Sequence, residues 1–320
     1  MFTSDFLHTF YFAIPALCVV GASWCIIGYV MRNCPKNDIS SSSIQKAGAF
    51  LSIVICLLIL AITRQRITSP ASSTAIICIV YMLSGVFNFS MLQFMSLSMQ
   101  RGPSGIIWAI IQSALIFPFM GGVVFFGQGA NRIQWLGILS IIFALFLFGA
   151  SKNNHSTHER QPSECNWRVL AFCAFVCAAL QQNMSTSPSY YPVTSGVPSI
   201  VRAMAVSLGT LIGCYIFNLF HAKSIKDNGR ARSNYKRPIF WKYVLAVQFF
   251  ALVTTYLLLF PSLDIMAQKG LGGAAYPLMV GSSIVSFTIL AVCQFRERLR
   301  PLQVLGLIFC TAGLVAICLK

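Results

Sequence analysis

Long apolar stretches recur along the 320-residue chain and constrain its fold more than any other feature. A helix needs roughly 20 mainly apolar residues to cross the hydrocarbon core of a bilayer. The sequence has ten such stretches, at approximately 10–31, 47–63, 74–98, 104–126, 133–150, 167–187, 198–220, 240–261, 274–295 and 302–319. Only 9% of the residues are charged, whereas a soluble domain has about a quarter. We therefore expect an all-α integral membrane protein with ten transmembrane helices, the first of them retained rather than cleaved as a signal peptide.

The basic residues are distributed unevenly between the connections of these helices. When the connections are assigned alternately to two sides, 17 of the 23 Lys and Arg residues fall on one side. Basic connections stay in the cytoplasm, so both termini are predicted to lie outside, in a multi-pass protein of the cell (inner) membrane. The net charge of +16 is then a signal of orientation, and we expect no nucleic-acid partner.

A helical hairpin occurs twice in the chain. Its second copy is 266–320, and the alignment starts by placing Gln268-Lys269-Gly270 on Gln100-Arg101-Gly102. The aligned pairs are Gly105 with Gly273, Trp108 with Tyr276, Phe119 with Phe287 and, after a shift of one residue, Gln134, Leu136 and Gly137 with Gln303, Leu305 and Gly306. Two copies of one hairpin in a membrane protein indicate a transporter built from repeats. The polar stretch 152–166 is the predicted linker between a first half, 1–151, and a second half, 167–320.

Residues that could support metal binding or catalysis are scattered or lie in loops. Ten of the twelve cysteines fall within or at the edge of apolar stretches, where cysteine behaves as a small apolar residue. His155, His158, Glu159 and Glu164 resemble a ligand set, but their Ser/Asn/Pro-rich surroundings favour a solvated connection. The chain has no CxxC motif, no catalytic triad pattern and no Gly-rich phosphate loop. We therefore expect no enzyme activity, metal or cofactor.

Polar and aromatic side chains interrupt several of the apolar stretches. An amide at membrane depth is costly unless it bonds across helices or faces an aqueous cavity. The candidate cavity residues are Trp24, Asn88, Gln93, Trp108, Gln112, Gln181, Gln182, Gln248, Tyr256 and Tyr276. The alternative is that these groups only hold helices together. Pro118 should kink its helix, and Arg202 either snorkels toward the interface or clamps a substrate.

The chain resembles the drug/metabolite transporter superfamily. The resemblance rests on Glu297-Arg298-Leu299, Pro301-Leu302-Gln303 and Gly306 in the second half, and on Pro118, Gln134 and Leu136-Gly137 in the first. It implies two five-helix inverted repeats with alternating access and a cavity between the first, third, fourth, sixth, eighth and ninth helices. Gln128 stands where the family usually has Glu. Termini outside and a basic connection after the first helix look more like the sugar branch typified by the L-rhamnose–proton symporter.

The seven acidic residues bear on the substrate and on coupling. All of them fall in loops or at predicted helix ends, including Asp264 beyond the eighth stretch. A proton-coupled cation exporter needs a carboxylate at membrane depth. We therefore expect a secondary transporter of a small polar metabolite, neutral and sugar-like, without proton coupling, that works in the lipid bilayer as a monomer or homodimer. The alternatives are an exporter of amino acids, other metabolites or drugs, a nucleotide-sugar exchanger, and a non-transporting receptor or scaffold.

Overall fold

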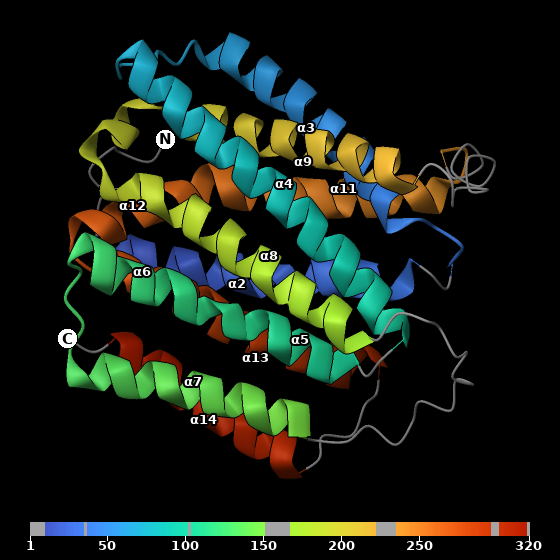
Figure 1. Ribbon diagram of the computed structural model, residues 1–320, viewed down its shortest axis with the longest axis vertical. Helices are drawn as coiled ribbons and strands as arrows, with labels where there is room; N and C mark the ends of the chain where they lie inside the picture. The colour runs from blue at the N-terminus through green and yellow to red at the C-terminus, as the bar shows by residue number, and fades with distance from the viewer. Residues whose placement is uncertain are drawn as a thin grey trace.

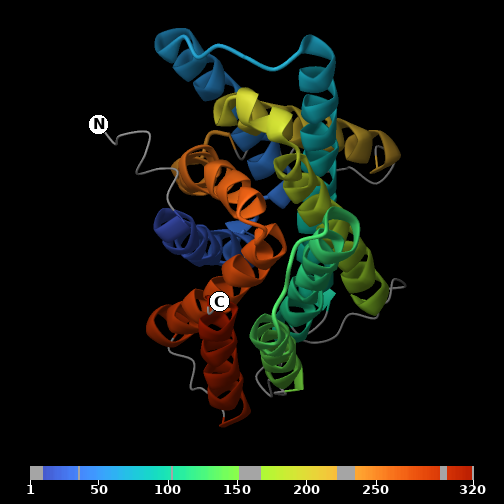
Figure 2. The ribbon, with the colours of Figure 1, turned by 90° about the vertical axis from the view of Figure 1, so that its left-hand side faces the viewer.

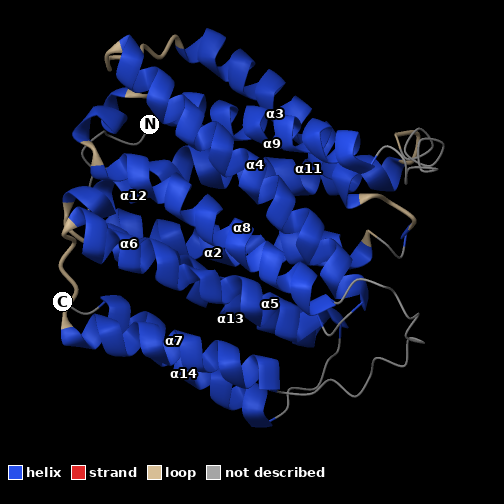
Figure 3. Ribbon diagram, viewed as in Figure 1, coloured by secondary structure: helices blue, strands red, loops and turns tan. Residues whose placement is uncertain are grey.

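The structure is a computed structural model that describes residues 10–34, 37–101, 104–150, 167–221, 235–295 and 301–318. These residues form helices and short connections, without strands (Figure 3). The elements are α2 (Phe10–Asn33), α3 (Ser41–Thr63), α4 (Ala71–Arg101), α5 (Ser104–Gln112), η2 (Ser113–Leu115), α6 (Ile116–Phe126), α7 (Arg132–Ala150), α8 (Trp167–Thr186), η3 (Ser187–Tyr190), η4 (Pro192–Gly196), α9 (Ser199–His221), α11 (Pro238–Val253), η5 (Thr254–Leu259), α12 (Phe260–Gln268), η6 (Gly272–Ala274), α13 (Ala275–Phe295) and α14 (Pro301–Cys318). The predicted linker 152–166, most of the long basic connection (222–234) and the hairpin connection 296–300 lie outside the described residues.

Seven helices of the described chain are long and apolar enough to cross a membrane. They are Tyr11–Met31, Ser41–Thr63, Ala71–Gln100, Trp167–Tyr190, Ser199–Leu219, Pro238–Gln268 and Gly272–Leu290, and three shorter apolar helices accompany them at Ile110–Phe126, Arg132–Leu147 and Val304–Ile317. Large apolar side chains point outward from these helices, as Phe125 does at 82% exposure and Phe146 at 68%. Such a surface suits lipid rather than water. The predicted class, an all-helical multi-pass membrane protein, is confirmed at this level.

The helices lie side by side and alternate in direction along the chain (Figure 1). The start of α2 and the end of α14 lie at one end of the bundle, together with the α3–α4, α6–α7, α8–α9 and α12–α13 connections (Figure 1). We call this the terminal end. Lys46, Arg101, Arg168, Lys236 and Arg237 belong to helix ends at the other side, which we call the basic end. Arg64, Arg66, Arg132 and Lys269 lie at or beside helix ends at the terminal end, and the predicted orientation stays a prediction.

The core is made by a few extensively packed helix pairs. Helix α4 packs on α8 and α9, α2 packs on α13 and on α12, and α3 packs on α9 and α11. Helices α7 and α14 pack on each other at one edge of the bundle, as the view from the terminal end shows (Figure 2). Their backbones approach closely, because a Cβ on Gly313 would lie 2.6 Å from the Gly137 carbonyl oxygen. Glycine permits this separation, and small residues commonly do so between membrane helices.

Two helices are irregular next to a proline. The fourth apolar stretch changes at η2, a 3-10 turn that ends three residues before Pro118. Since Pro118 has no N–H group, the Ala114 carbonyl in this turn loses its usual helical partner. The eighth stretch contains the π-helical turn η5 just before Pro261, and then continues through α12 to Gln268. The predicted end at residue 261 was wrong, because a proline in the first turn of a new helical segment does not stop the helix.

Candidate functional site

A buried network of hydroxyl and amide groups joins α4 and α8 and lies next to α13. The Ser84 hydroxyl of α4 lies 2.7 Å from the Ser185 hydroxyl of α8 and 3.3 Å from the Gln181 carbonyl oxygen. The Gln181 side-chain amide donates to the Ser185 hydroxyl at 3.1 Å. On α13, the Tyr276 side chain is only 1% exposed, and it lies close to Ser185 and Gln181. The structure thus places two predicted site residues, Gln181 and Tyr276, close to each other.

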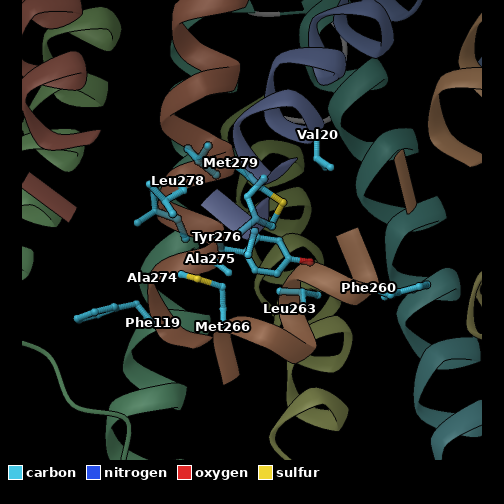
Figure 4. Packing of buried hydrophobic residues seen from close by; sticks show 14 of the residues in the cluster. Val20, Phe119, Phe260, Leu263, Met266, Ala274, Ala275, Tyr276, Leu278 and Met279 are labelled. Atoms are coloured by element: carbon cyan, nitrogen blue, oxygen red, sulfur yellow. The ribbon is translucent and has the colours of Figure 1, made fainter. Parts of the chain in front are cut away.

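Apolar side chains hold the Tyr276 ring in place. The ring belongs to the largest buried cluster of the described chain, together with Leu263, Met266 and Met279 (Figure 4). Leu263 and Met266 come from α12, and Met279 lies one turn further along α13. Because protein interiors are close-packed, this arrangement leaves the ring little freedom to rotate away. The phenol therefore presents its hydroxyl to α8 in a defined position.

The same face of α13 carries the contacts with α5. Residues 276, 283 and 287 are separated by seven and four positions, so their side chains lie along one stripe of the helix. The Gln112 side-chain amide donates to the Ser283 hydroxyl at 3.4 Å, a long hydrogen bond. The Trp108 ring stacks on Phe287 at a centroid distance of 5.5 Å and an interplanar angle of 18°. Four of the predicted residues, Trp108, Gln112, Gln181 and Tyr276, are therefore arranged along α13.

Two buried atoms, one on α5 and one on α8, have unused hydrogen-bonding capacity. The Trp108 indole N–H and the side-chain oxygen of Gln182 are buried, and neither has a hydrogen-bond partner among the described residues. Gln182 follows Gln181 on α8 and is 3% exposed. A buried polar group without a partner costs roughly 1–3 kcal/mol. A polar ligand or ordered water at either atom would remove this cost.

The other predicted residues lie apart from this network. Gln93 accepts a hydrogen bond from Ser41 at 3.2 Å, near the start of α3. Gln248 accepts one from Ser52 at 2.6 Å, between α11 and α3, and Tyr256 accepts one from Gln65 at 3.0 Å. These contacts correspond to the alternative in which polar groups join helices. Of the two remaining predicted residues, Asn88 is half-buried, and the half-buried Trp24 packs against the apolar cluster that contains Tyr276.

A buried ion pair lies near the terminal end, between α9 and α12. The Arg202 guanidinium, 2% exposed, donates to Asp264 Oδ1 at 3.0 Å and lies 2.8 Å from Oδ2. It also donates to the Val197 carbonyl at 2.9 Å and to the Thr194 carbonyl at 2.8 Å. Two parallel contacts to a carboxylate are the strongest arrangement that arginine makes. The expectation that Arg202 snorkels toward the interface was wrong, because the guanidinium is buried and bonded within the protein.

The expectation that every acidic residue lies in a loop or at a helix end was wrong for Asp264. Because the eighth helix continues to Gln268, Asp264 lies within an apolar helix and is 13% exposed. One sequence signal could have indicated the pair. A charged residue inside an apolar stretch needs a partner of opposite sign. Arg202 lies inside one such stretch, and Asp264 lies three residues beyond the end of another.

These side chains define what the site can bind. The α13 face offers hydroxyl, amide and aromatic groups, and the two nearby charges neutralise each other. Within the described ranges no group of three or more His, Cys, Asp or Glu could hold a metal ion. Such a surface can hydrogen-bond a neutral polar molecule and stack against its apolar face.

Comparisons with known proteins place the fold alone. No protein-family model matches the sequence, and no curated protein does. One solved structure, described only as "Crystal structure of protein", superposes with a TM-score of 0.67. The two sequences are 12% identical over 96% of this chain and 98% of that chain. The chain is thus similar along nearly its whole length to a protein fold seen in a crystal.

Proposed function

We propose that this chain is a secondary transporter of the drug/metabolite transporter type, built from two five-helix inverted repeats. It moves a small neutral polar solute, sugar-like in its hydroxyl content, across the cell membrane by alternating access. The binding site is the α13 face, to which α4, α5 and α8 contribute. The basic end faces the cytoplasm and both termini face outside, because basic connections remain inside.

The pattern of packed helix pairs carries this proposal. Each helix of the first half is matched with one of the second half. The pairs are α2 with α8, α3 with α9, α4 with α11–α12, α5–α6 with α13, and α7 with α14. Under this match, the contact between α2 and α13 is equivalent to the contact between α8 and α5–α6. The contact between α4 and α8 is equivalent to the contact between α12 and α2. The contact between α4 and α9 is equivalent to the contact between α11 and α3. Two contacts, α7 with α14 and α3 with α9, join matched helices, so each is its own equivalent. An inverted repeat with a pseudo-two-fold axis produces this pattern.

The charges near the site favour a neutral substrate. Arg202 is engaged by Asp264 and by two carbonyl groups, so it has little capacity left for an anionic substrate. The residues that contact α13, Gln181, Ser185 and Gln112, carry no charge. A charged solute would lose its hydration without gaining a counter-charge, which is costly in a buried site. Nucleotide-sugar exchange and export of cationic drugs are disfavoured for the same reason.

Uptake by purified protein in proteoliposomes tests the proposal. The panel consists of sugars, polyols, amino acids and nucleosides, and we expect saturable flux of a neutral polyhydroxylated solute. Trp108→Ala should weaken its binding by about 1–3 kcal/mol, roughly 5- to 150-fold, through loss of a stacked aromatic contact. Trp241→Ala is the matched control, because Trp241 is 42% exposed at the start of α11. A folded protein that moves no solute of the panel would contradict transport and favour a receptor or scaffold.

A further inference from the structure

The chain between α8 and α9, residues 187–197, connects the polar end of α8 with the buried ion pair. It consists of the 3-10 turns η3 and η4 and continues directly from Ser185, a member of the hydroxyl network. Thr194 and Val197, two residues of this segment, supply the carbonyl groups that Arg202 binds. Any movement of this segment at the terminal end is therefore coupled to the candidate binding site and to the ion pair.

The first fastening of the segment is the Arg202 guanidinium. Its Nε and one terminal nitrogen donate to the segment, while Asp264 of α12 receives the remaining contacts. One side chain of α9 thereby joins the segment to α12. Because the guanidinium is 2% exposed, removal of the carboxylate would leave a buried charge with carbonyl partners only. The segment could then be displaced at a lower free-energy cost.

The second fastening is the Tyr190 ring, which fits against glycines. The ring stacks on Phe126 of α6 at a centroid distance of 4.1 Å and an interplanar angle of 19°. A Cβ on Gly122 would lie 2.7 Å from the Tyr190 hydroxyl, and one on Gly272 would lie 2.5 Å from its ring. Neither glycine could be replaced without displacing the ring. Tyr190 thus connects the second half of the chain to α6 in the first half.

A third set of contacts ties the segment to the α3–α4 connection. The Thr68 backbone N–H donates to the Gly196 carbonyl at 3.0 Å, and the Ser69 hydroxyl donates to the Val193 carbonyl at 2.6 Å. The segment therefore contacts α6, α9, α12, η6 and the α3–α4 connection at once.

We infer that residues 187–197 form a gate that closes the terminal end, fastened by the Arg202–Asp264 ion pair and by Tyr190 against Gly122 and Gly272. This inference rests on the proposed transport by alternating access. In the conformation of this structure the gate is closed. Opening of the terminal end requires Tyr190 to leave its glycine contacts and Arg202 to release the Thr194 and Val197 carbonyl groups.

The first experiment measures gate opening without transport. Ser189 is 5% exposed within the segment, and Ser189→Cys places a reporter thiol there. A hydrophilic maleimide is applied to the full-length protein in nanodiscs, and its reaction at this peptide is followed by mass spectrometry. Asp264→Asn should raise the reaction rate at least tenfold. The matched carboxylate control is Asp38→Asn, which is exposed in the α2–α3 connection and should leave the rate unchanged.

A second variant covers the possibility that Asp264→Asn fails to fold. Tyr190→Leu leaves the ion pair intact and should also raise the reporter rate at least tenfold. A folded Asp264→Asn or Tyr190→Leu protein with the parental rate would overturn the inference. The maleimide reaction needs no substrate, so its rate tests the gate even if no solute of the panel is transported.

The second experiment measures transport while a disulfide holds the gate closed. Cysteines replace Ser69 and Gly196, because a Cβ on Gly196 would point at the Ser69 side chain. A disulfide between them would link the segment to the α3–α4 connection. Oxidation should reduce uptake at least tenfold, and a reductant should restore it. Normal uptake by the fully cross-linked protein would overturn the gate and leave the transport proposal standing. Absence of uptake by the parental protein would contradict transport alone.

Discussion

The crossing of α7 and α14 allows a prediction whose size follows from the structure. A Cβ on Gly313 would lie 2.6 Å from the Gly137 carbonyl oxygen, and a Cβ on Gly137 would lie 2.8 Å from that of Gly313. Real Cβ contacts stay above 3.0 Å, so an alanine at Gly313 must part the backbones by at least about 0.4 Å. Ile141 and Ile317 are buried beside this crossing and lose contact as it opens.

The expected cost follows from these lost contacts. A radial gap of 0.5–1 Å forfeits about a quarter to a half of the attraction between facing atoms. We therefore expect Gly137→Ala and Gly313→Ala each to destabilise the fold by about 1–3 kcal/mol. The double variant should cost less than the sum, because the first methyl group already separates the helices and leaves room for the second.

Thermal unfolding followed with a thiol-reactive dye measures the loss of stability. Cys56 and Cys310 are buried, so we expect them to react with the dye only on unfolding. Each single variant should lower the apparent Tm by about 2–8 °C. Gly129→Ala is the matched control, because nothing lies within 4 Å of its Cβ position. An unchanged Tm in Gly313→Ala would refute the close approach of the two helices. Fully additive losses would refute the idea that both glycines serve one crossing.

Three further predictions use independent features. Burial raises the pKa of the Cys34 thiol to about 12, so at pH 8 its thiolate fraction is about a thousandfold lower than that of a free thiol. We expect alkylation at pH 8 to be at least 100-fold slower than at the exposed Cys293, and equal rates after denaturation are the control. Tyr276→Phe removes a buried hydroxyl and should weaken solute binding about 5- to 10-fold, with little change in Tm; unchanged binding would exclude a contact with the solute. An impermeant maleimide on intact cells should label a cysteine at Lys269 but not one at Lys236, and the reverse would contradict the proposed orientation.

The existence of the helices could be read from the sequence because apolar length alone specifies a membrane helix. The end of the eighth helix could not, because Pro261 looks like a stop unless a π-helical turn precedes it. Composition does not show which proline begins a new helical segment, since this depends on the packing around it. The error placed Asp264 outside the membrane helices and removed the partner that Arg202 requires.

The candidate site was predictable in part for a similar reason. Trp108 and Gln112 lie four residues apart, so their shared face was visible in the sequence, and both contact α13. Gln93 and Gln248 are also amides within apolar helices, but they bond to Ser41 and Ser52 of α3. Periodicity shows which residues share a face of one helix. It does not show which neighbour that face meets, because this depends on how each helix is rotated in the bundle.

The separation of Arg202 and Asp264 along the chain has a consequence for biosynthesis. The two residues are 62 positions apart, so ribosomes adding 5–20 residues per second complete the acid about 3–12 s after the arginine. During this interval the Arg202 guanidinium of α9 has no carboxylate partner, and a charge without one is costly in hydrocarbon. We expect α9 to remain in contact with the insertion machinery until α12 emerges, which cross-linking of arrested nascent chains of increasing length would detect. Release of α9 into lipid before residue 264 is made would show that the arginine finds another partner first. If α9 is retained as expected, the release of α9 into the membrane waits until Asp264 has been synthesised.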